Sequence, residues 1–290
     1  MKYAFPTITI VIPTYNRPDR LAAALQALKR LHYPRDRFEV LVVDDGSPVL
    51  SEAVVKPFRE LLDITLLTQP HAGPAVARNT GAAQATGTYL AFTDDDCAPA
   101  PDWLKSLAVR FAATPDCAIG GRTLNALPHD LYATASQLLI DYLYTYYNSD
   151  LNKARFLTSN NLALPAELFR AIGGFDTTFR RAGGEDREFC DRWLYLGYQM
   201  HYAPEVIVYH SHALTMQTFW KQHYNYGRGA FSFHQARARR GAGRVQLEPL
   251  SFYLNLLRYP FSAERNWRAL QLAALFVVSQ GANAAGFWCK

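Results

Sequence analysis

Residues 88–96 read TYLAFTDDD, an apolar run typical of a buried strand that ends in three consecutive aspartates. Adjacent carboxylates repel one another and raise one another's pKa, so the cluster needs a compensating partner. The two candidates are a solvated turn and a bound cation. The end of this predicted strand is therefore a candidate site.

The same pattern recurs through the first half of the chain, where predicted strands alternate with predicted helices. The strands cover 7–13, 39–47, 63–69 and 88–96, and the helices follow Pro18, cover 51–62 and cover 74–85. Continuous apolar strands in this alternation are typical of a parallel sheet covered on both faces. The predicted fold class is α/β, with a mostly parallel central sheet flanked by helices.

Three of these strands end in polar or acidic segments. They are Pro13-Thr14-Tyr15-Asn16, Asp44-Asp45-Gly46-Ser47 and Asp94-Asp95-Asp96. Ligands of open α/β sheets bind at the carboxyl ends of the strands, so these residues are expected to gather at one edge. The G-x-G-x-x-G and Walker A patterns are absent from the sequence, which excludes those two modes of nucleotide binding.

The second half has a looser pattern. We expect a helix over 131–148, a strand over 156–165, a glycine-rich loop before a helix that opens at Glu185-Asp186, and one or two strands over 199–212. The last of these ends in His210 and His212, whose i, i+2 spacing places them on one face. The four cysteines are scattered, which predicts neither a disulfide framework nor a zinc site and suits a reducing compartment. The N-terminus is expected to be the first strand rather than a signal peptide.

Asp94 and Asp96 could hold a hard cation. In an extended segment they would point to the same face, where Mg²⁺ or Mn²⁺ could bind together with substrate phosphates. One of His210 and His212 could complete such a site, and His210 is the expected ligand. The alternatives are a capped turn before a helix near Pro101 and a purely structural histidine.

Three further positions have a functional and a structural interpretation. Asp45 could bind a base or a ribose, or could be a turn residue. Arg78 could bind a phosphate or a base carbonyl, or could lie on a solvated helix face. One of Glu185 and Asp186 could be a general base after two glycines that let a ligand approach the backbone, or the pair could be an ordinary helix start.

Four stretches of the sequence, taken in order, resemble the family 2 glycosyltransferases over roughly residues 6–212. They are VIPTYNRP, VVDDGS, GPAVARNTGAAQATGTYLAFTDDDCAPAPDWL and SNNLALPAELFRAIGGFDTTFRRAGGEDREFCDRWLYLG. The resemblance implies the GT-A fold, a Rossmann-like sheet. It also implies a nucleotide-diphosphate sugar as donor, of which a UDP-sugar is the expected class, and Mn²⁺ or Mg²⁺ as cofactor. Most members invert the anomeric carbon.

The resemblance also implies roles for individual residues. Asp186 would be the catalytic base, with Glu185 beside it, and Asp96 the main metal ligand, with Asp94 as the other acid of the motif. His210 is expected as a further ligand from its place at the end of a strand. The residues expected to bind the nucleotide-sugar are Pro13, Thr14, Tyr15, Asp45, Arg78, Asp94, Asp95, Asn161 and Arg228, with Asp45 at the nucleobase and Arg228 at the diphosphate.

We expect a catalytic domain over 1–212, with nucleotide-sugar binding in about 1–123 and the acceptor part in about 124–212. A basic and apolar helical extension over 213–290 follows. Between Glu205 and Glu248 the chain has no acid, and its bases there are Lys221, Arg228, Arg237, Arg239, Arg240 and Arg244. Such a stretch favours a polyanion such as an anionic membrane surface. The stretch from Ala269 to Cys289 has no charge. It could span a membrane, lie at its interface, or pack as a core helix or oligomer contact.

The sequence thus predicts a metal-dependent, inverting glycosyltransferase that adds sugar to a glycan or lipid-linked acceptor, as in the synthesis of polysaccharides, glycolipids or cell-surface glycans. The Q-x-x-R-W motif of processive synthases is absent, so transfer of one sugar is expected. Alternatives are a nucleotidyltransferase and a non-catalytic sugar-nucleotide-binding or scaffold protein. Aromatic residues within the basic stretch make nucleic-acid binding a further alternative, but the acidic site already accounts for the first two hundred residues, so no nucleic-acid partner is expected. The expected location is the cytoplasm, with peripheral binding at the inner membrane face.

Overall fold

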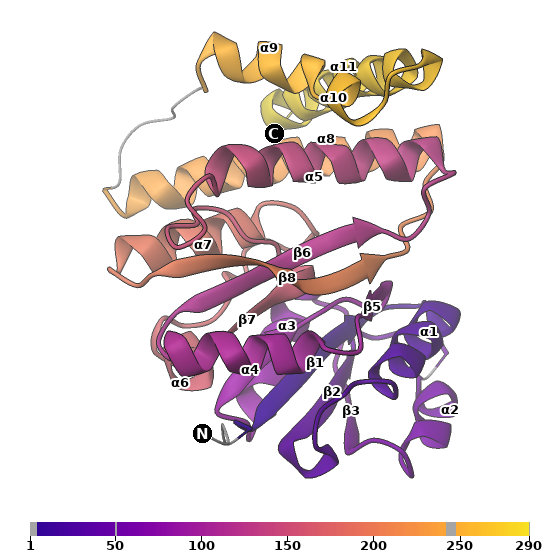
Figure 1. Ribbon diagram of the computed structural model, residues 1–290, viewed down its shortest axis with the longest axis vertical. Helices are drawn as coiled ribbons and strands as arrows, with labels where there is room; N and C mark the ends of the chain where they lie inside the picture. Colours follow the sequence, from indigo (N-terminus) through magenta and orange to yellow (C-terminus); the bar gives the residue numbers. More distant parts are fainter. Residues whose placement is uncertain (1–4, 50, 242–247, 290) are drawn as a thin grey trace.

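The computed structural model describes residues 5–49, 51–241 and 248–289, so Arg244 of the basic stretch lies outside the described residues. The described chain forms one eight-stranded sheet in the order β3-β2-β1-β4-β7-β6-β8-β5 (Figure 1). The strands are β1 (Ile8–Thr14), β2 (Phe38–Asp44), β3 (Ile64–Thr68), β4 (Tyr89–Phe92), β5 (Cys97–Pro99), β6 (Ala118–Asn125), β7 (Leu162–Pro165) and β8 (Met200–His210).

The helices follow the predicted alternation in the first half. They are α1 (Pro18–Leu28), α2 (Glu52–Val55), α3 (Pro74–Gln84), α4 (Trp103–Ala113), α5 (Leu131–Tyr147), α6 (Ala166–Ala171), α7 (Glu185–Tyr195), α8 (Met216–Arg239), α9 (Leu250–Arg258), α10 (Pro260–Ala263) and α11 (Trp267–Trp288). The helix expected over 51–62 is shorter. It changes to a 3₁₀ turn over Lys56–Phe58 because Pro57 lacks the N–H that an α-helix needs.

The sheet is parallel where the sequence alternates and mixed elsewhere. Strand β1 pairs in parallel with both β2 and β4, and β2 pairs in parallel with β3. Strand β7 runs antiparallel to β4 and β6, and β5 runs antiparallel to β8. The α/β prediction is confirmed, and the antiparallel pairs bring the second half of the chain onto the same sheet.

Helices cover both faces of the sheet. Leu21, Leu25 and Leu28 of α1 and Trp103 of α4 belong to one buried cluster, and the other face is covered by α3, α6 and α7, where Trp193 is fully buried. A third cluster joins α5, α8, α9 and α11. In Figure 1 these last helices form the end of the molecule away from β1–β3.

The uncharged tail forms α11, and one face of this helix packs on α8 and α5. The packing on α8 is close: a Cβ added to Gly227 would lie 2.0 Å from the Asn283 carbonyl oxygen, and one added to Gly286 would lie 1.9 Å from that of Tyr224. By length and composition, α11 is the one helix among the described residues that could cross a membrane. The packed-helix interpretation is confirmed for the face that carries Leu272 and Phe276. The opposite face is exposed.

Candidate active site

The ends of the first strands meet as the sequence predicts. The Thr14 hydroxyl at the end of β1 donates to Asp95 Oδ2 at 2.8 Å, and the Asp45 N–H after β2 donates to the Thr14 carbonyl at 2.9 Å. Pro13 precedes Thr14 in β1, opposite Val43 of β2. Thr14, Asp45 and Asp95 are buried. The polar residues of the three strand ends therefore form one edge.

A tight turn separates the side chains of Asp94 and Asp96. The Cys97 N–H donates to the Asp94 carbonyl at 3.1 Å, which closes a turn between β4 and β5. The prediction that Asp94 and Asp96 share a face is wrong because this segment is a turn and not an extended strand. Asp94 accepts a hydrogen bond from Arg78 at 2.7 Å, whereas Asp96 faces two histidines.

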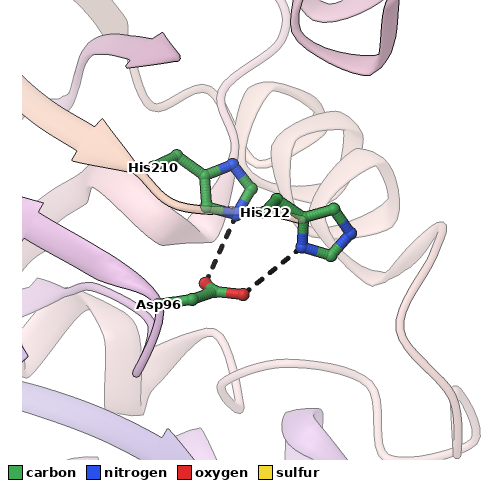
Figure 2. A group of neighbouring side chains, drawn as sticks. All are labelled: Asp96, His210 and His212. Carbon is green, nitrogen blue, oxygen red and sulfur yellow. Dashed lines mark hydrogen bonds and ion pairs between the residues drawn. The ribbon is translucent and has the colours of Figure 1, made fainter. Parts of the chain in front are cut away.

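Asp96, His210 and His212 form a group that could hold a metal ion (Figure 2). His210 Nε2 lies 3.3 Å from Asp96 Oδ1, and His212 Nδ1 lies 3.3 Å from Asp96 Oδ2. The antiparallel register of β5 and β8 pairs Cys97 with His210 and so brings the aspartate turn to the histidine strand. Figure 2 shows both rings turned toward the carboxylate.

The electrostatics of this group favour an ionised Asp96. Burial by itself raises the pKa of Asp96, but hydrogen bonds and charges from His210 and His212 outweigh it and hold the pKa well below its usual value. Burial lowers the pKa of His210, and the Asp96 carboxylate outweighs that effect and raises it. Without a metal ion, the carboxylate and the protonated His210 form an ion pair, and a metal ion would have to replace the imidazole proton to bind that nitrogen.

The chemistry of the donor set fits a metal. One carboxylate and two imidazoles suit a transition metal such as Mn²⁺ better than Mg²⁺, which prefers an all-oxygen shell. The three ligand atoms lie within 4.8 Å of one another. The group contains both His210 and His212, but it does not include Asp94, whose Oδ1 accepts from Arg78.

Two arginines of the α1 region also reach the aspartates. Arg17 lies 3.1 Å from Asp95 Oδ1 and Arg20 lies 2.9 Å from Asp96 Oδ2. A cavity of about 180 Å³ borders Arg20, Asp95 and Asp96. Burial raises the pKa of Asp95 to about 6 although the Arg17 charge opposes the shift. The repulsion between the aspartates is thus offset by arginine and histidine.

The catalytic pair expected at Glu185-Asp186 opens α7 as predicted. Asp186 Oδ2 accepts from the Ser159 N–H at 3.1 Å, and within the described residues its buried Oδ1 has no hydrogen-bond partner. Burial raises the pKa of Asp186, and Arg78 opposes that shift. Burial and the neighbouring Asp186 raise the pKa of the buried Glu185. Asp186 therefore has a free oxygen and an increased proton affinity, as a general base requires.

Arg78 links this pair to the aspartate turn. It is buried, it donates to Asp94 at 2.7 Å, and its Nη1 lies 3.6 Å from Glu185 Oε1. Its pKa is raised, since the charges of Asp94, Asp186 and Glu185 outweigh the opposing effect of burial. The solvated-face interpretation of Arg78 is wrong. The guanidinium joins the two acidic groups, and its Nε and Nη1 have no hydrogen-bond partner in the described part of the chain.

The glycines before α7 serve a contact with α8. Gly184 has φ 96°, in the left-handed region that glycine adopts most easily. A Cβ on it would lie 2.7 Å from the Gly229 backbone, and one on Gly183 would lie 2.8 Å from the Tyr226 ring. The expectation that these glycines let a ligand approach is therefore wrong for this loop, because helix α8 occupies the space.

Asp45 holds a loop at the predicted nucleobase position. Its carboxylate accepts from the Ala72 N–H at 2.9 Å, from the Gly73 N–H at 2.9 Å and from Gln69 Nε2 at 2.7 Å. The half-exposed Tyr15 ring stacks on His71 of this loop, with centroids 4.2 Å apart. Asp45 is at the expected edge, and its contact with a base stays a prediction.

Asn161 and Arg228 differ in their surroundings. Asn161 is buried and accepts from Trp103 Nε1 at 2.9 Å, while its amide donates to the carbonyls of Val206 and Arg122. These bonds hold the fold together and do not match the predicted donor contact. Arg228 is half-buried on α8, and its diphosphate contact stays a prediction.

Some residues of this edge were not found from the sequence. His71, Arg17, Arg20 and Gln222 stand outside the acidic motifs, and Gln222 Oε1 accepts from His212 Nε2 at 2.7 Å. Arg17 and Arg20 belong to the segment NRPDR, which directly follows the first strand, so their place at the strand end could have been predicted from the sequence. Arg237 and Arg240 of the basic stretch pair with acids of α7, Arg240 with Glu188 and both with Asp191. These two charges are therefore internal and do not form a free basic surface.

A family model described as "Glycosyl transferase family 2" matches residues 9–173, and one described as "N-terminal domain of galactosyltransferase" matches residues 144–215. Glycosyltransferase AglE of Haloferax volcanii is 27% identical over 231 residues, which cover 79% of this chain and 74% of that protein. Pre-mycofactocin glycosyltransferase of Mycobacterium tuberculosis is 30% identical over 236 residues, which cover 77% of this chain and 46% of that protein. The chain therefore spans about half the length of the second relative.

Two solved structures share the fold. The mannosyltransferase PcManGT from Pyrobaculum calidifontis, in complex with GDP-Man and Mn²⁺, has a TM-score of 0.67 at 21% identity and covers 99% of this chain and 88% of its own. Residues 1–349 of S. aureus TarS in complex with UDP-GlcNAc have a TM-score of 0.57 at 16% identity, covering 97% and 89%. With the matched motifs and the GT-A architecture, these comparisons show that the chain belongs to the family 2 glycosyltransferases.

Proposed function

We propose that the chain transfers one sugar from a nucleotide-diphosphate sugar to an acceptor hydroxyl, with inversion at the anomeric carbon and with a divalent cation. One observation carries the proposal: Arg78 joins Asp94 of the aspartate turn to Glu185 beside Asp186. Arg78 thus lies between the aspartate turn, whose Asp96 belongs to the candidate cation group, and Glu185 beside the candidate base Asp186. This arrangement supports the proposal that charge stabilisation and proton transfer take place at the same sheet edge.

The proposed steps follow from these residues. Asp186 Oδ1 accepts the proton of the acceptor hydroxyl while that oxygen forms a bond to C1 of the sugar. The bond between C1 and the diphosphate oxygen breaks on the opposite face, so a single displacement inverts the carbon, as in inverting glycosidases. The nucleoside diphosphate leaves with the bonding electrons.

The cation site is proposed at Asp96, His210 and His212. A bound Mn²⁺ would neutralise negative charge that develops on the leaving diphosphate. Ionised Asp96 anchors this position, and Arg17 and Arg20 supply further positive charge. A UDP-sugar is the proposed donor class, which the UDP-GlcNAc complex of TarS supports, and the Mn²⁺ complex of the mannosyltransferase supports the metal.

A glycan or lipid-linked acceptor is proposed, in the synthesis of a polysaccharide, glycolipid or cell-surface glycan. Relatives named chondroitin synthase and hyaluronan synthase support this choice. We also propose a cytoplasmic enzyme that binds the inner membrane face through α9–α11. The exposed face of α11 carries no charge, and its ends are Trp267, 72% exposed, and Trp288, 80% exposed. Exposed Arg258 and Arg265 lie in the same helical layer, where anionic lipid would attract them.

Membrane binding predicts a measurable partition. The wild-type chain is expected to co-sediment with vesicles of phosphatidylcholine and phosphatidylglycerol, and the double substitution Trp267→Glu, Trp288→Glu is expected to lower this binding by about tenfold or more, because two interfacial aromatic anchors are replaced by charge. The matched control is Val109→Glu on α4, which is also exposed and apolar but lies outside α9–α11. Equal sedimentation of all three proteins would contradict the proposal.

The central test is thermal unfolding with a panel of UDP, GDP, UDP-GlcNAc, UDP-glucose and GDP-mannose, in MnCl₂ and in EDTA. A ligand that binds only the folded state stabilises it, by about 2.7 kcal/mol at a ligand concentration of 100 Kd, and so raises Tm. We expect an increase with one nucleotide class that is lost in EDTA. A flat response across the panel in MnCl₂ would contradict metal-dependent donor binding.

A further inference from the structure

Gln222 on α8 is the direct neighbour of one metal-ligand candidate. Its Oε1 accepts from His212 Nε2 at 2.7 Å. Its amide nitrogen donates to the Tyr226 hydroxyl at 2.9 Å and to the Ser136 hydroxyl at 2.9 Å. In this orientation both amide hydrogens are donated to hydroxyl oxygens, and the amide oxygen faces His212.

This contact determines which nitrogen of His212 carries hydrogen. An amide oxygen can only accept, so Nε2 must donate, and a neutral ring then has its lone pair on Nδ1. Nδ1 is the atom that lies 3.3 Å from Asp96 Oδ2. Without a cation, a protonated Nδ1 donates to Asp96 at this distance. A cation between the two atoms would replace that proton, while the Nε2–H would stay donated to Gln222. Metal-bound histidines commonly donate their second N–H to such a partner, which fixes the ring and its tautomer.

The anchor of Gln222 is itself well supported. Tyr226 follows Gln222 by four residues, so the two side chains lie on one face of α8. The Tyr226 ring lies against Gly183, in the loop that leads into α7. The glutamine is thus fixed by the same part of α8 that packs on the catalytic loop, and it cannot turn away from His212 without losing both donor bonds.

We propose that Gln222 is a positioning residue that holds His212 with Nδ1 directed to a metal ion at Asp96. The proposal rests on the metal-dependent function proposed above. In this proposal Gln222 acts on the ion only through His212. Its contribution is the orientation and the tautomer of His212.

The test measures Mn²⁺ affinity without turnover. The electron paramagnetic resonance signal of free Mn²⁺ is followed as MnCl₂ is titrated into the full chain, with and without UDP or GDP. Gln222→Met keeps the length of the side chain but removes the acceptor, and it is expected to raise the Kd for Mn²⁺ by about 10-fold to 100-fold. Gln222→Glu restores an acceptor for His212 Nε2–H. Its Kd for Mn²⁺ is expected to stay within about threefold of the wild-type value, a much smaller change than that of Gln222→Met.

The matched control is Gln271→Met on the exposed face of α11, which should bind Mn²⁺ as the wild-type chain does. If Gln222→Met has wild-type affinity while the wild-type chain binds Mn²⁺, the positioning role is wrong. If Gln222→Met and Gln222→Glu weaken Mn²⁺ binding by the same factor and lower Tm by the same amount, Gln222 only supports the packing of α8, and the inference also fails. If the wild-type chain itself binds no Mn²⁺, both the metal-dependent function and this inference are overturned.

Discussion

Replacing Asp186 with asparagine is expected to lower kcat by about 10²-fold to 10⁴-fold, because an amide oxygen cannot take the proton of the acceptor hydroxyl. Nucleotide binding should be retained, since the amide oxygen can still accept from the Ser159 N–H that now bonds Asp186 Oδ2 at 3.1 Å. The measurement is release of UDP or GDP from the nucleotide-sugar that gives the largest increase in Tm, together with the Kd of the nucleotide.

Asp191→Asn is the matched control for this substitution. Asp191 lies on the same helix, but its carboxylate pairs with Arg237 and Arg240 and not with Arg78. It should therefore keep kcat while showing any general cost of losing an acid from α7. Near-normal turnover by Asp186→Asn would exclude Asp186 as the base. A loss of nucleotide affinity equal to the loss of kcat would indicate that Asp186 holds the donor instead.

The positions of the main acidic groups could be predicted because they depend on local pattern and on one topological rule. A strand such as Ile8–Thr14 is visible as an apolar run, and parallel pairing then brings its end beside Asp45 and Asp95. The start of α7 at Glu185 was visible for the same reason, since two glycines and two acids mark a helix start. Local chemistry and sheet topology together specify this edge.

Contacts between distant elements could not be predicted in the same way. The separation of Asp94 from Asp96 depends on a turn, and the role of Gly184 depends on helix α8, which is far away in the sequence. Asn161 has the same polarity in a donor site as in a core, and only its three bonded neighbours reveal which it is. The residues around Arg78 leave open whether it binds a ligand or lies on a solvated helix face, because its contact with Glu185 depends on where α7 packs.

Asp96→Ala is expected to abolish the increase in nucleotide affinity that Mn²⁺ provides, with the Kd for Mn²⁺ itself rising by more than the 10-fold to 100-fold typical of an outer-shell change. Asp96 is the one carboxylate of the candidate group, so its loss leaves two imidazoles without the anionic ligand. The measurement is the nucleotide Kd in MnCl₂ and in EDTA, compared as a ratio for each protein.

The ratio is needed because Asp96 also has a structural role. Its carboxylate is the shared partner of Arg17, Arg20, His210 and His212, and four donors around a missing charge would lower Tm even without metal. A fall in Tm alone therefore says nothing of the metal. Asp116→Ala, an exposed acid before β6, should keep the wild-type ratio. If Asp96→Ala also keeps that ratio, the cation does not bind at Asp96, and the aspartate turn is held by its arginines and histidines alone.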